Sequence, residues 1–383
     1  MYIKEIIGKI PQYRLARAGL VSPGKPLNLT FSVTNVCQSR CKTCNIWEIY
    51  KNNPENRANE LTLAEIENIF QSMGHIYLFN VSGGEPFLRG DFVDIIRAAC
   101  KYLTPGLIHI PTNAIAEKQV LKQTRQIIEL LKNAYPNTKL TIKPSLDHVG
   151  GKHDDIRGMP GNFEKVMAVF KSLQELKTEY AHLHVELGTV ISRWNVNDIR
   201  EIAAFITSLD PDSYRNEIAE QRSEMLNMEN PITPDAEQYE KAIHFFVSEL
   251  KGNMQNKRLF NRITNAFRLE YYDLAIRILH AKRQVIPCYA GISNAHMTPY
   301  GDIWACCTLG YEKPMGNLRD YGYDFHALWQ SPQAESVRSH IKAGHCHCPM
   351  ANQMYSNILL HAPSLARVLY KIAAQGKNRN KAA

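Results

Sequence analysis

The stretch TNVCQSRCKTCNIW, residues 34–47, places three of the nine cysteines of this 383-residue chain within eight positions. Cys37, Cys41 and Cys44 have the spacing C-x3-C-x2-C and follow an apolar, β-branched run at residues 27–34. Three thiolates on one short loop can hold three corners of a [4Fe–4S] cube and leave the fourth iron open to another ligand. A zinc site completed by a distant histidine, or three unrelated cysteines, are the alternatives that the loop alone leaves open.

The composition is that of a globular protein with a full hydrophobic core. Hydrophobic residues make up 44% of the chain and charged residues 21%, and the formal net charge of +8 is a mild bias. No apolar run approaches the roughly 18 residues of a membrane span, and the N-terminal residues lack the apolar segment of a secretory signal. We therefore expect a cytoplasmic protein, in which clustered cysteines bind metal or perform chemistry rather than form disulfides.

Apolar runs alternate with helical patterns between residues 27 and 220. The expected strands cover residues 27–34, 76–83, 106–113, 140–147, 184–192 and 213–219. A strand followed by a helix, repeated about six times, predicts an α/β fold of parallel strands covered by helices, a partial (βα)6 TIM-like barrel. Such a fold places its chemistry at the carboxyl ends of the strands.

Changes in residue pattern and composition divide the whole chain into regions. We expect an N-terminal helical extension at residues 1–26, the barrel at 27–220, and a helical region that shapes the substrate site at 221–285. A small cysteine-rich domain punctuated by Gly and Pro follows at 286–350. A C-terminal helix, interrupted at Pro363, and a basic tail complete the chain at 351–383.

The second predicted strand ends in a glycine pair. Gly83 and Gly84 are followed by Glu85 and Pro86. Paired glycines permit close backbone approach, and a carboxylate suits an ammonium partner. Together with the cysteine loop, these residues resemble the radical S-adenosylmethionine (radical SAM) superfamily and its GGEP motif. Thr43 stands where that family carries an aromatic residue, which weakens one packing expectation near the adenine.

The resemblance implies a cofactor site and a reaction. It implies that the three loop cysteines hold a [4Fe–4S] cluster, that S-adenosylmethionine chelates the open iron, and that GGEP contacts the amino group of its methionine moiety. One electron then cleaves the sulfonium to methionine and a 5′-deoxyadenosyl radical, which abstracts hydrogen from a C–H bond. A fourth cysteine would block this chemistry. The implied enzyme also needs an electron donor such as flavodoxin or ferredoxin.

Weaker matches follow the other predicted strands. Asn113 ends the third strand, Ser145 and Asp147 end the fourth, Arg157 comes shortly after, and Val190 lies near the end of the fifth. The resemblance implies that they bind S-adenosylmethionine: Ser145 and Asp147 its ribose or carboxylate, Arg157 its carboxylate, and the backbone near Val190 its adenine. Ordinary loop polarity is the alternative for each residue taken separately.

The C-terminal region carries a second group of cysteines, Cys288, Cys306, Cys346 and Cys348. The arrangement C-x12-G-x4-C from Cys288 to Cys306 resembles the opening of the SPASM and twitch domains, which hold auxiliary clusters. Because only Cys346 and Cys348 follow, we predict one auxiliary [4Fe–4S] cluster with four protein ligands, closer to a twitch domain. A zinc ion on the same thiolates, and Cys307 in place of Cys306, stay open.

Cys100, His345 and His347 are not expected to be cluster ligands. Cys100 is expected to be a small buried hydrophobic residue, and His345 and His347 are expected to be exposed or to lie beside the cluster ligands.

The substrate is the least specific part of the prediction. No sequence resembling a peptide-recognition domain precedes the first strand, so we favour a small molecule, sugar or lipid precursor as substrate. A peptide or protein maturase, of the kind that matures ribosomal peptides or sulfatases, and a non-catalytic iron–sulfur electron carrier or scaffold are the alternatives. Glu217, Glu220 and Arg222 are placed either near the barrel mouth or on a solvated helical face.

The charge pattern suggests few macromolecular partners. The basic C-terminal tail, which includes Lys371, Lys377, Arg379 and Lys381, permits weak contact with a membrane surface. No motif of interleaved aromatic and basic residues is present, so we expect no nucleic-acid partner.

Overall fold

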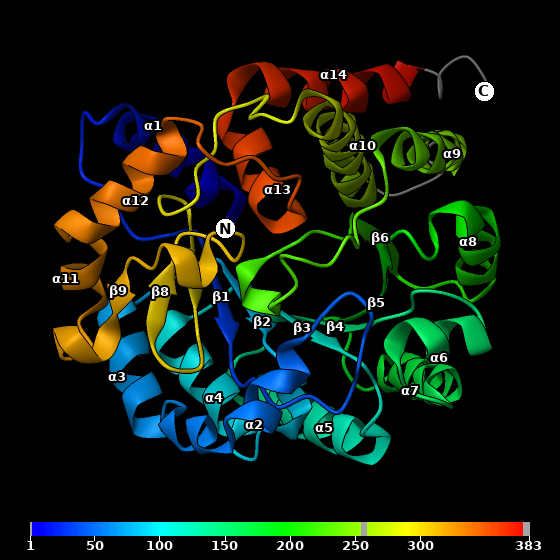
Figure 1. Ribbon diagram of the computed structural model, residues 1–383, viewed down its shortest axis with the longest axis horizontal. Helices are drawn as coiled ribbons and strands as arrows, with labels where there is room; N and C mark the ends of the chain where they lie inside the picture. The colour runs from blue at the N-terminus through cyan, green and yellow to red at the C-terminus, as the bar shows by residue number, and fades with distance from the viewer. Residues whose placement is uncertain (1, 254–258, 378–383) are drawn as a thin grey trace.

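The computed structural model describes residues 2–253 and 259–377, and within them nine strands form one sheet in the order β6-β5-β4-β3-β2-β1-β7-β8-β9 (Figure 1). The first six strands are parallel, each paired with the next. They are β1 Asn28–Ser32, β2 Leu78–Ser82, β3 Leu107–Thr112, β4 Lys139–Pro144, β5 Leu183–Ile191 and β6 Ser213–Ile218. All six lie within or close to the predicted ranges, and the predicted partial (βα)6 barrel is confirmed.

Helices connect the parallel strands, because a parallel pair needs a crossover that runs back along the sheet. The crossover helices are α2 Ile49–Asn52, α3 Leu63–Met73, α4 Phe92–Ala98, α5 Glu117–Ala134, α6 Gly151–Arg157, α7 Asn162–Leu176 and α8 Ile199–Ser208. The α5 helix shows why they pack: Val120, Ile127 and Leu131 recur at helical spacing and are fully buried. A π-helical turn, Ala99–Leu103, extends α4 and carries the buried Cys100, as predicted.

The sheet does not end at β1. Strand β7, Asn294–Met297, pairs in parallel with the free edge of β1 and places His296 opposite Thr30. Strands β8, Asp302–Trp304, and β9, Gly316–Asn317, follow in antiparallel order. The region predicted as the barrel, 27–220, and the region predicted as a small domain, 286–350, thus contribute to one continuous sheet, and the predicted domain boundaries stay a prediction.

The region predicted to be helical from 221 to 285 begins as a loop. Residues 221–235 contain only a short 3-10 turn, Ser223–Met225, and α9 starts at Ala236 and ends at Asn253. The following helix, α10 Leu259–Ala281, packs against α9 and against the C-terminal helices. The remaining helices are α1 Tyr2–Ala18, α11 Phe325–Trp329, α12 Pro332–Lys342, α13 Ala351–Leu360 and α14 Ala362–Lys377.

Within the described residues, the C-terminal segment forms two helices, α13 and α14. The chain breaks at His361, and Pro363 lies in the first turn of α14, where its missing N–H costs no helical hydrogen bond. Lys371, which we assigned to the basic tail, belongs to α14, and its Nζ lies 2.7 Å from Oε2 of the buried Glu270. Residues 378–383, with Arg379 and Lys381, lie outside the described residues, so the predicted membrane-surface contact stays a prediction. None of the described helices is both long and apolar enough to cross a membrane.

Candidate functional site

The loop with the first three cysteines is held against the end of β2 by backbone hydrogen bonds. Gly84 N donates to Thr34 O at 2.7 Å, and Glu85 N donates to Val36 O at 2.8 Å. A Cβ on Gly84 would lie 2.3 Å from Val36 O, and one on Gly83, whose φ is +116°, would lie 2.2 Å from Thr34 O. Only glycine fits at either position, so the cysteine loop and GGEP form one structural unit.

The other side of the same loop is held by the end of α6. Arg40 N donates to Arg157 O at 3.1 Å, and Lys42 N donates to Ile156 O at 2.9 Å. A Cβ on Gly158, at φ +62°, would lie 2.2 Å from Arg40 O. The cysteine loop is therefore fixed between two backbone segments and has little freedom to change its shape.

The three thiols lie close together and fit a positively charged iron centre. Asn113 Nδ2 donates to Cys37 Sγ at 3.7 Å, and Arg157 Nη1 donates to Cys41 Sγ at 3.6 Å. Burial, reinforced by the nearby Cys41, raises the pKa of Cys37 to about 12 and raises the pKa of Cys44 further. Free thiols here would stay protonated, whereas an iron ligand is deprotonated by the metal. The donor set thus fits a [4Fe–4S] cluster with three thiolate ligands.

The carboxylate of Glu85 is hydrogen-bonded within the protein. Its carboxylate is only 1% exposed and accepts hydrogen bonds from Asn113 N at 2.7 Å and from Thr112 Oγ1 at 2.9 Å. Burial raises the pKa of Glu85 to about 7, although these two donors oppose the shift. The side chain therefore joins the end of β2 to the end of β3. A contact between this motif and the amino group of the cofactor stays a prediction.

Asp147 connects the ends of β4 and β5 with the cysteine loop. Its Oδ2 lies 2.9 Å from Arg157 Nε, and its Oδ1 accepts a hydrogen bond from Val190 N at 2.8 Å. Ser145 N donates to Thr112 O at 2.9 Å, beside the same strand ends. The structure thus gathers these predicted residues at the carboxyl ends of the strands, and their contacts with S-adenosylmethionine stay predictions. Both backbone groups of Val190 have partners within the protein, because its N–H donates to Asp147 and its carbonyl accepts from Asn195 Nδ2 at 3.0 Å.

The second group of cysteines is assembled from distant segments. Cys288, Cys346 and Cys348 line one small cavity together with Gln284. Burial raises the pKa of Cys306 to about 12, and the neighbouring Cys288 and Cys346 contribute to that shift. The structure therefore brings the four predicted ligands together, as a cluster with four thiolates requires. The neighbouring His345 and His347 are exposed.

Side chains outside the cysteine motifs hold this second site. Arg17 Nε, from α1, donates to Cys288 O at 2.9 Å, and Gln284 Nε2 donates to Cys346 O at 3.1 Å. A role of α1 at this site was not predicted. The chain gives no local signal for this contact, because Arg17 and Cys288 are 271 positions apart.

Two protein families match the regions of the chain that contain the two groups of cysteines. Residues 31–206 match the radical SAM superfamily, and residues 288–349 match the SPASM family, an iron–sulfur cluster-binding domain. The chain belongs to the radical SAM superfamily and carries a SPASM domain. It is therefore an enzyme whose cofactors are iron–sulfur clusters and S-adenosylmethionine, as the sequence analysis predicted.

Individual relatives are distant. The subtilosin biosynthesis protein AlbA of Bacillus subtilis is 22% identical over 334 residues, which cover 84% of this chain and 65% of AlbA. This chain thus spans just under two thirds of AlbA. The AdoMet-dependent heme synthase of Methanosarcina barkeri is 23% identical over 288 residues, 72% of this chain and 75% of the synthase. The crystal structure of Streptococcus suis SuiB bound to precursor peptide SuiA has a TM-score of 0.59 at 15% identity, covering 88% of this chain and 70% of SuiB.

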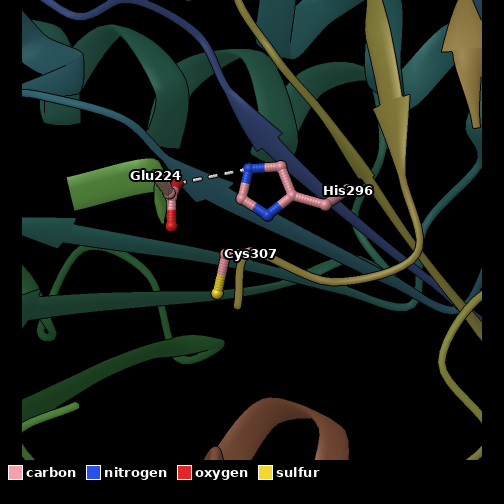
Figure 2. A group of neighbouring side chains, drawn as sticks. All are labelled: Glu224, His296 and Cys307. Carbon is pink, nitrogen blue, oxygen red and sulfur yellow. Dashed lines mark ion pairs between the residues drawn. The ribbon is translucent and has the colours of Figure 1, made fainter. Parts of the chain in front are cut away.

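The SPASM region also separates two adjacent cysteines. Cys306 lies with the other three SPASM cysteines, whereas Cys307 lies beside Glu224 and His296 (Figure 2). The thiol of Cys307 donates to Met350 Sδ at 2.9 Å. The geometry therefore favours Cys306 as the fourth cluster ligand.

A cavity lies between the radical SAM motifs and the SPASM cysteines. Its wall includes Ser82, which directly precedes Gly83, and the pair Cys306 and Cys307. Further lining residues are Thr30, Arg222, Glu224, Asn294, Ala295, His296, Ala305, Met350, Asn352 and Gln353. The cavity thus takes polar groups from the end of β2, next to the GGEP motif, and from the SPASM region, as a substrate pocket between two cofactor sites requires.

The loop at residues 220–227 connects the two cysteine groups. Of the two placements considered for Glu220 and Arg222, the structure favours the barrel mouth over a solvated helical face, because Glu220 is buried and Arg222 lines the cavity. Asn227 Nδ2 donates to Thr43 O at 2.8 Å, in the radical SAM loop. On the SPASM side, a Cβ on Gly310 would lie 2.3 Å from Ser223 Oγ, so the two loops touch closely. Asn and Pro recur in the sequence NMENPITP from Asn227 onward, and these turn residues were the available signal.

Proposed function

We propose that this chain is a radical SAM maturase that modifies a C–H bond of a peptide. The sequence analysis favoured a small-molecule substrate and kept a peptide maturase as the alternative. The relatives support the alternative better: AlbA is named for bacteriocin biosynthesis, and SuiB was crystallised with a precursor peptide. The observation that carries the proposal is the polar cavity between the end of β2, next to the GGEP motif, and the SPASM pair Cys306 and Cys307, where a substrate would be reached from both sides.

The residues of the radical SAM side would hold and orient the cofactors. Cys37, Cys41 and Cys44 would ligate the cluster that binds S-adenosylmethionine. When bound, the cluster and S-adenosylmethionine supply a carbon radical that takes a hydrogen atom from a C–H bond. Asp147 fixes Arg157 beside Cys41, and this buried pair excludes water from the cluster.

The remaining proposed cofactor contacts follow the strand ends. Gly83, Gly84, Glu85 and Pro86 would place backbone groups of the GGEP segment near the amino group of the cofactor. Asn113, Ser145 and Val190 would complete the pocket for its other polar and adenine groups. Each of these assignments extends the observed position of the residue to a contact with the cofactor.

The cavity wall offers groups that suit a peptide backbone. Arg222 is a donor whose charge is compensated by Glu220, with Nη2 and Oε2 3.0 Å apart, and the side-chain amide of the exposed Asn352 can donate and accept. Cys288, Cys306, Cys346 and Cys348 would hold the auxiliary cluster beside this wall. With four protein ligands that cluster has no position for substrate, so electron transfer is the role that suits it.

A small molecule remains the second candidate, since the chain is also similar to a heme synthase. One experiment separates the two. The protein is purified without oxygen, reduced, and incubated with S-adenosylmethionine and either short peptides encoded beside its gene or a set of tetrapyrroles. The formation of 5′-deoxyadenosine is measured, with Cys44→Ala as control.

We expect one of the peptides to accelerate 5′-deoxyadenosine formation and to change in mass by a loss of hydrogen. Acceleration by a tetrapyrrole and by none of the peptides would favour the second candidate. No 5′-deoxyadenosine from iron-loaded wild type would contradict the assigned chemistry itself and favour an electron carrier or scaffold.

A further inference from the structure

Three side chains with different ligand atoms meet in the wall of the cavity. Glu224 comes from the 3-10 turn after β6, His296 from β7, and Cys307 from the loop after β8 (Figure 2). All three residues are buried, and one carboxylate oxygen, one imidazole nitrogen and the thiol sulfur lie within 4.8 Å of one another. Neither the radical SAM motif nor the set of four SPASM cysteines uses any of them.

The three side chains are held in place by their neighbours. Ser32 Oγ lies 2.8 Å from His296 Nε2 and donates to Glu224 Oε1 at 3.1 Å. Trp304 lies opposite His296 in the β7–β8 pairing, and its ring packs on the imidazole with centroids 5.1 Å apart. Such contacts restrict the orientation of a ligand before it binds a metal.

The turn that carries Glu224 is fixed just as firmly. Gly310 approaches Ser223 so closely that a Cβ there would lie 2.3 Å from Ser223 Oγ. Asn45 N donates to Met225 O at 2.9 Å on the other side of the turn. The carboxylate therefore faces His296 and Cys307 because both neighbours of Glu224 are anchored.

The surrounding charges leave room for a cation. Arg222, which lies beside Cys307, is already paired with the buried Glu220, with Nη2 and Oε2 3.0 Å apart. The pair is formally neutral, so the carboxylate of Glu224 and a thiolate of Cys307 would together carry a charge of about −2. Burying such charges without a partner costs several kcal/mol, and a divalent ion would compensate them.

We propose that Glu224, His296 and Cys307 form a mononuclear site for a divalent metal ion of the zinc type. The ion would bind to His296 Nε2 and Glu224 Oε1, which lie 3.3 Å apart. One sulfur, one nitrogen and one oxygen ligand suit zinc, whereas magnesium and calcium prefer oxygen ligands alone. Three protein ligands leave a fourth position, which opens to the cavity and is free for water or a carboxylate or amide oxygen of the substrate. This inference does not rest on the peptide assignment.

The adjacent cysteines provide the test. The protein is purified without oxygen from zinc-supplemented cells with its clusters intact, and zinc and iron per chain are measured together with the zinc K-edge absorption, which does not detect iron. We expect about one zinc ion per chain, bound by one sulfur at about 2.3 Å and by nitrogen or oxygen ligands at about 2.0 Å.

The variants should separate the two metals. Cys307→Ala and Glu224→Gln should lower bound zinc at least about tenfold and leave iron unchanged. Cys306→Ala should lower iron and leave zinc unchanged. Because Glu224→Gln preserves size, its unchanged iron content and circular dichroism show that the fold is intact.

Two results would overturn the proposal. One is wild-type protein with less than about a tenth of a zinc ion per chain after this preparation. The other is zinc bound by four sulfur ligands and retained by Cys307→Ala, since that ion would occupy the SPASM cysteines instead.

Discussion

The radical SAM loop and the SPASM cysteines, the two sites that we assign to iron–sulfur clusters, are built in different ways. The first has three cysteines within eight positions, and the loop is shaped by hydrogen bonds to two short segments, Gly84–Glu85 and Ile156–Arg157. The second gathers four cysteines from three segments spread over 61 positions, held by Arg17 from the distant helix α1 and by Gln284 from the loop after α10.

This difference determines what each site depends on. Close backbone contacts hold the radical SAM loop on two sides, so one added methyl group at a contact should force the loop out of its shape. The SPASM site depends on hydrogen bonds between side chains and backbone across the fold, each worth roughly 1 to 3 kcal/mol. We therefore expect a single substitution to weaken the SPASM site only in part.

The largest effect is expected for Gly84→Ala. The new Cβ would lie 2.3 Å from Val36 O and 2.7 Å from Val36 C, so the cysteine loop must shift. We expect loss of the radical SAM cluster and a decrease in 5′-deoxyadenosine formation of about 100-fold or more. Iron per chain and product formation are the measurements.

Gly90→Ala is the matched control for that variant, because nothing lies within 4 Å of a Cβ at this exposed position. It should retain iron and activity. If Gly84→Ala also retains both, the loop is less constrained than the contacts indicate, and the contrast between the two sites fails.

A smaller effect is expected for Asp147→Asn. The amide oxygen can still accept from Val190 N, but the charge that faces Arg157 at 2.9 Å is lost. Leaving a buried guanidinium without its partner costs about 3 kcal/mol of stability. We expect KM for S-adenosylmethionine to rise about tenfold, which corresponds to about 1.4 kcal/mol.

The comparison for this variant is Asp155→Asn, on α6, the helix that carries Arg157. Asp155 pairs with Lys42 at 2.6 Å, but its side chain is 68% exposed, so the change should leave KM and stability nearly unaffected. Equal behaviour of the two variants would show that Asp147 does not position the cofactor site.

The same contrast explains what the sequence could predict. The six parallel strands and the cysteine loop are encoded in consecutive residues: β1 at Asn28–Ser32 lies within the predicted 27–34, and the three cysteines follow it. The hydrophobic period of the strands and the spacing of the cysteines are properties of neighbouring residues, so both can be recognised without knowledge of the fold. The four SPASM cysteines were found for the same reason, by motif.

What the sequence did not reveal is fixed by contacts between distant residues. Strand β7 is only four residues long, and its pairing with β1 joins positions 266 apart. The turn with Glu224 was predicted to be helical, but its bonds to Asn45 and its packing on Gly310 override the local pattern. Neither His296 nor Glu224 could be related to Cys307 without these tertiary contacts.

A weakened SPASM site is expected for Arg17→Ala. The change removes the hydrogen bond from Nε to Cys288 O and the packing of the guanidinium over Tyr289, 5.6 Å from the ring centroid. We expect the site to lose about 1 to 3 kcal/mol and the iron to leave the SPASM domain faster on exposure to a chelator. The radical SAM cluster should be unaffected, as Mössbauer or paramagnetic resonance spectra would show.

Arg125→Ala is the control for Arg17→Ala, because Arg125 forms an exposed pair with Glu179 far from either cysteine group. It should release iron at the wild-type rate. Faster loss of both clusters in Arg17→Ala would mean that α1 supports the whole fold rather than the SPASM site.

The smallest effect concerns Glu65, on α3 of the barrel, which bonds to Arg319 and Tyr323 in the SPASM region at 2.8 Å each. Hydrogen bonding from Arg319 lowers the pKa of Glu65 from 4.5 to about 2. A lowered folded-state pKa means that the stabilisation is fully present above pH 4.5 and is lost as the pH falls toward 2. Because solvent screens part of the interaction, we expect Glu65→Gln to cost about 1 to 2 kcal/mol at pH 7.

Urea unfolding of wild type and Glu65→Gln, followed by tryptophan fluorescence, would measure this difference at several pH values. The gap between the two proteins should shrink below pH 4.5, because protonation removes the same charge from wild type that the substitution removes. Cluster loss at low pH affects both proteins and leaves the difference unchanged. Glu179→Gln, which removes an exposed surface pair, should cost less than about 0.5 kcal/mol. A gap that stays constant down to pH 2 would mean that the Glu65 carboxylate contributes through packing alone, so that no charge joins the SPASM region to the barrel at this point.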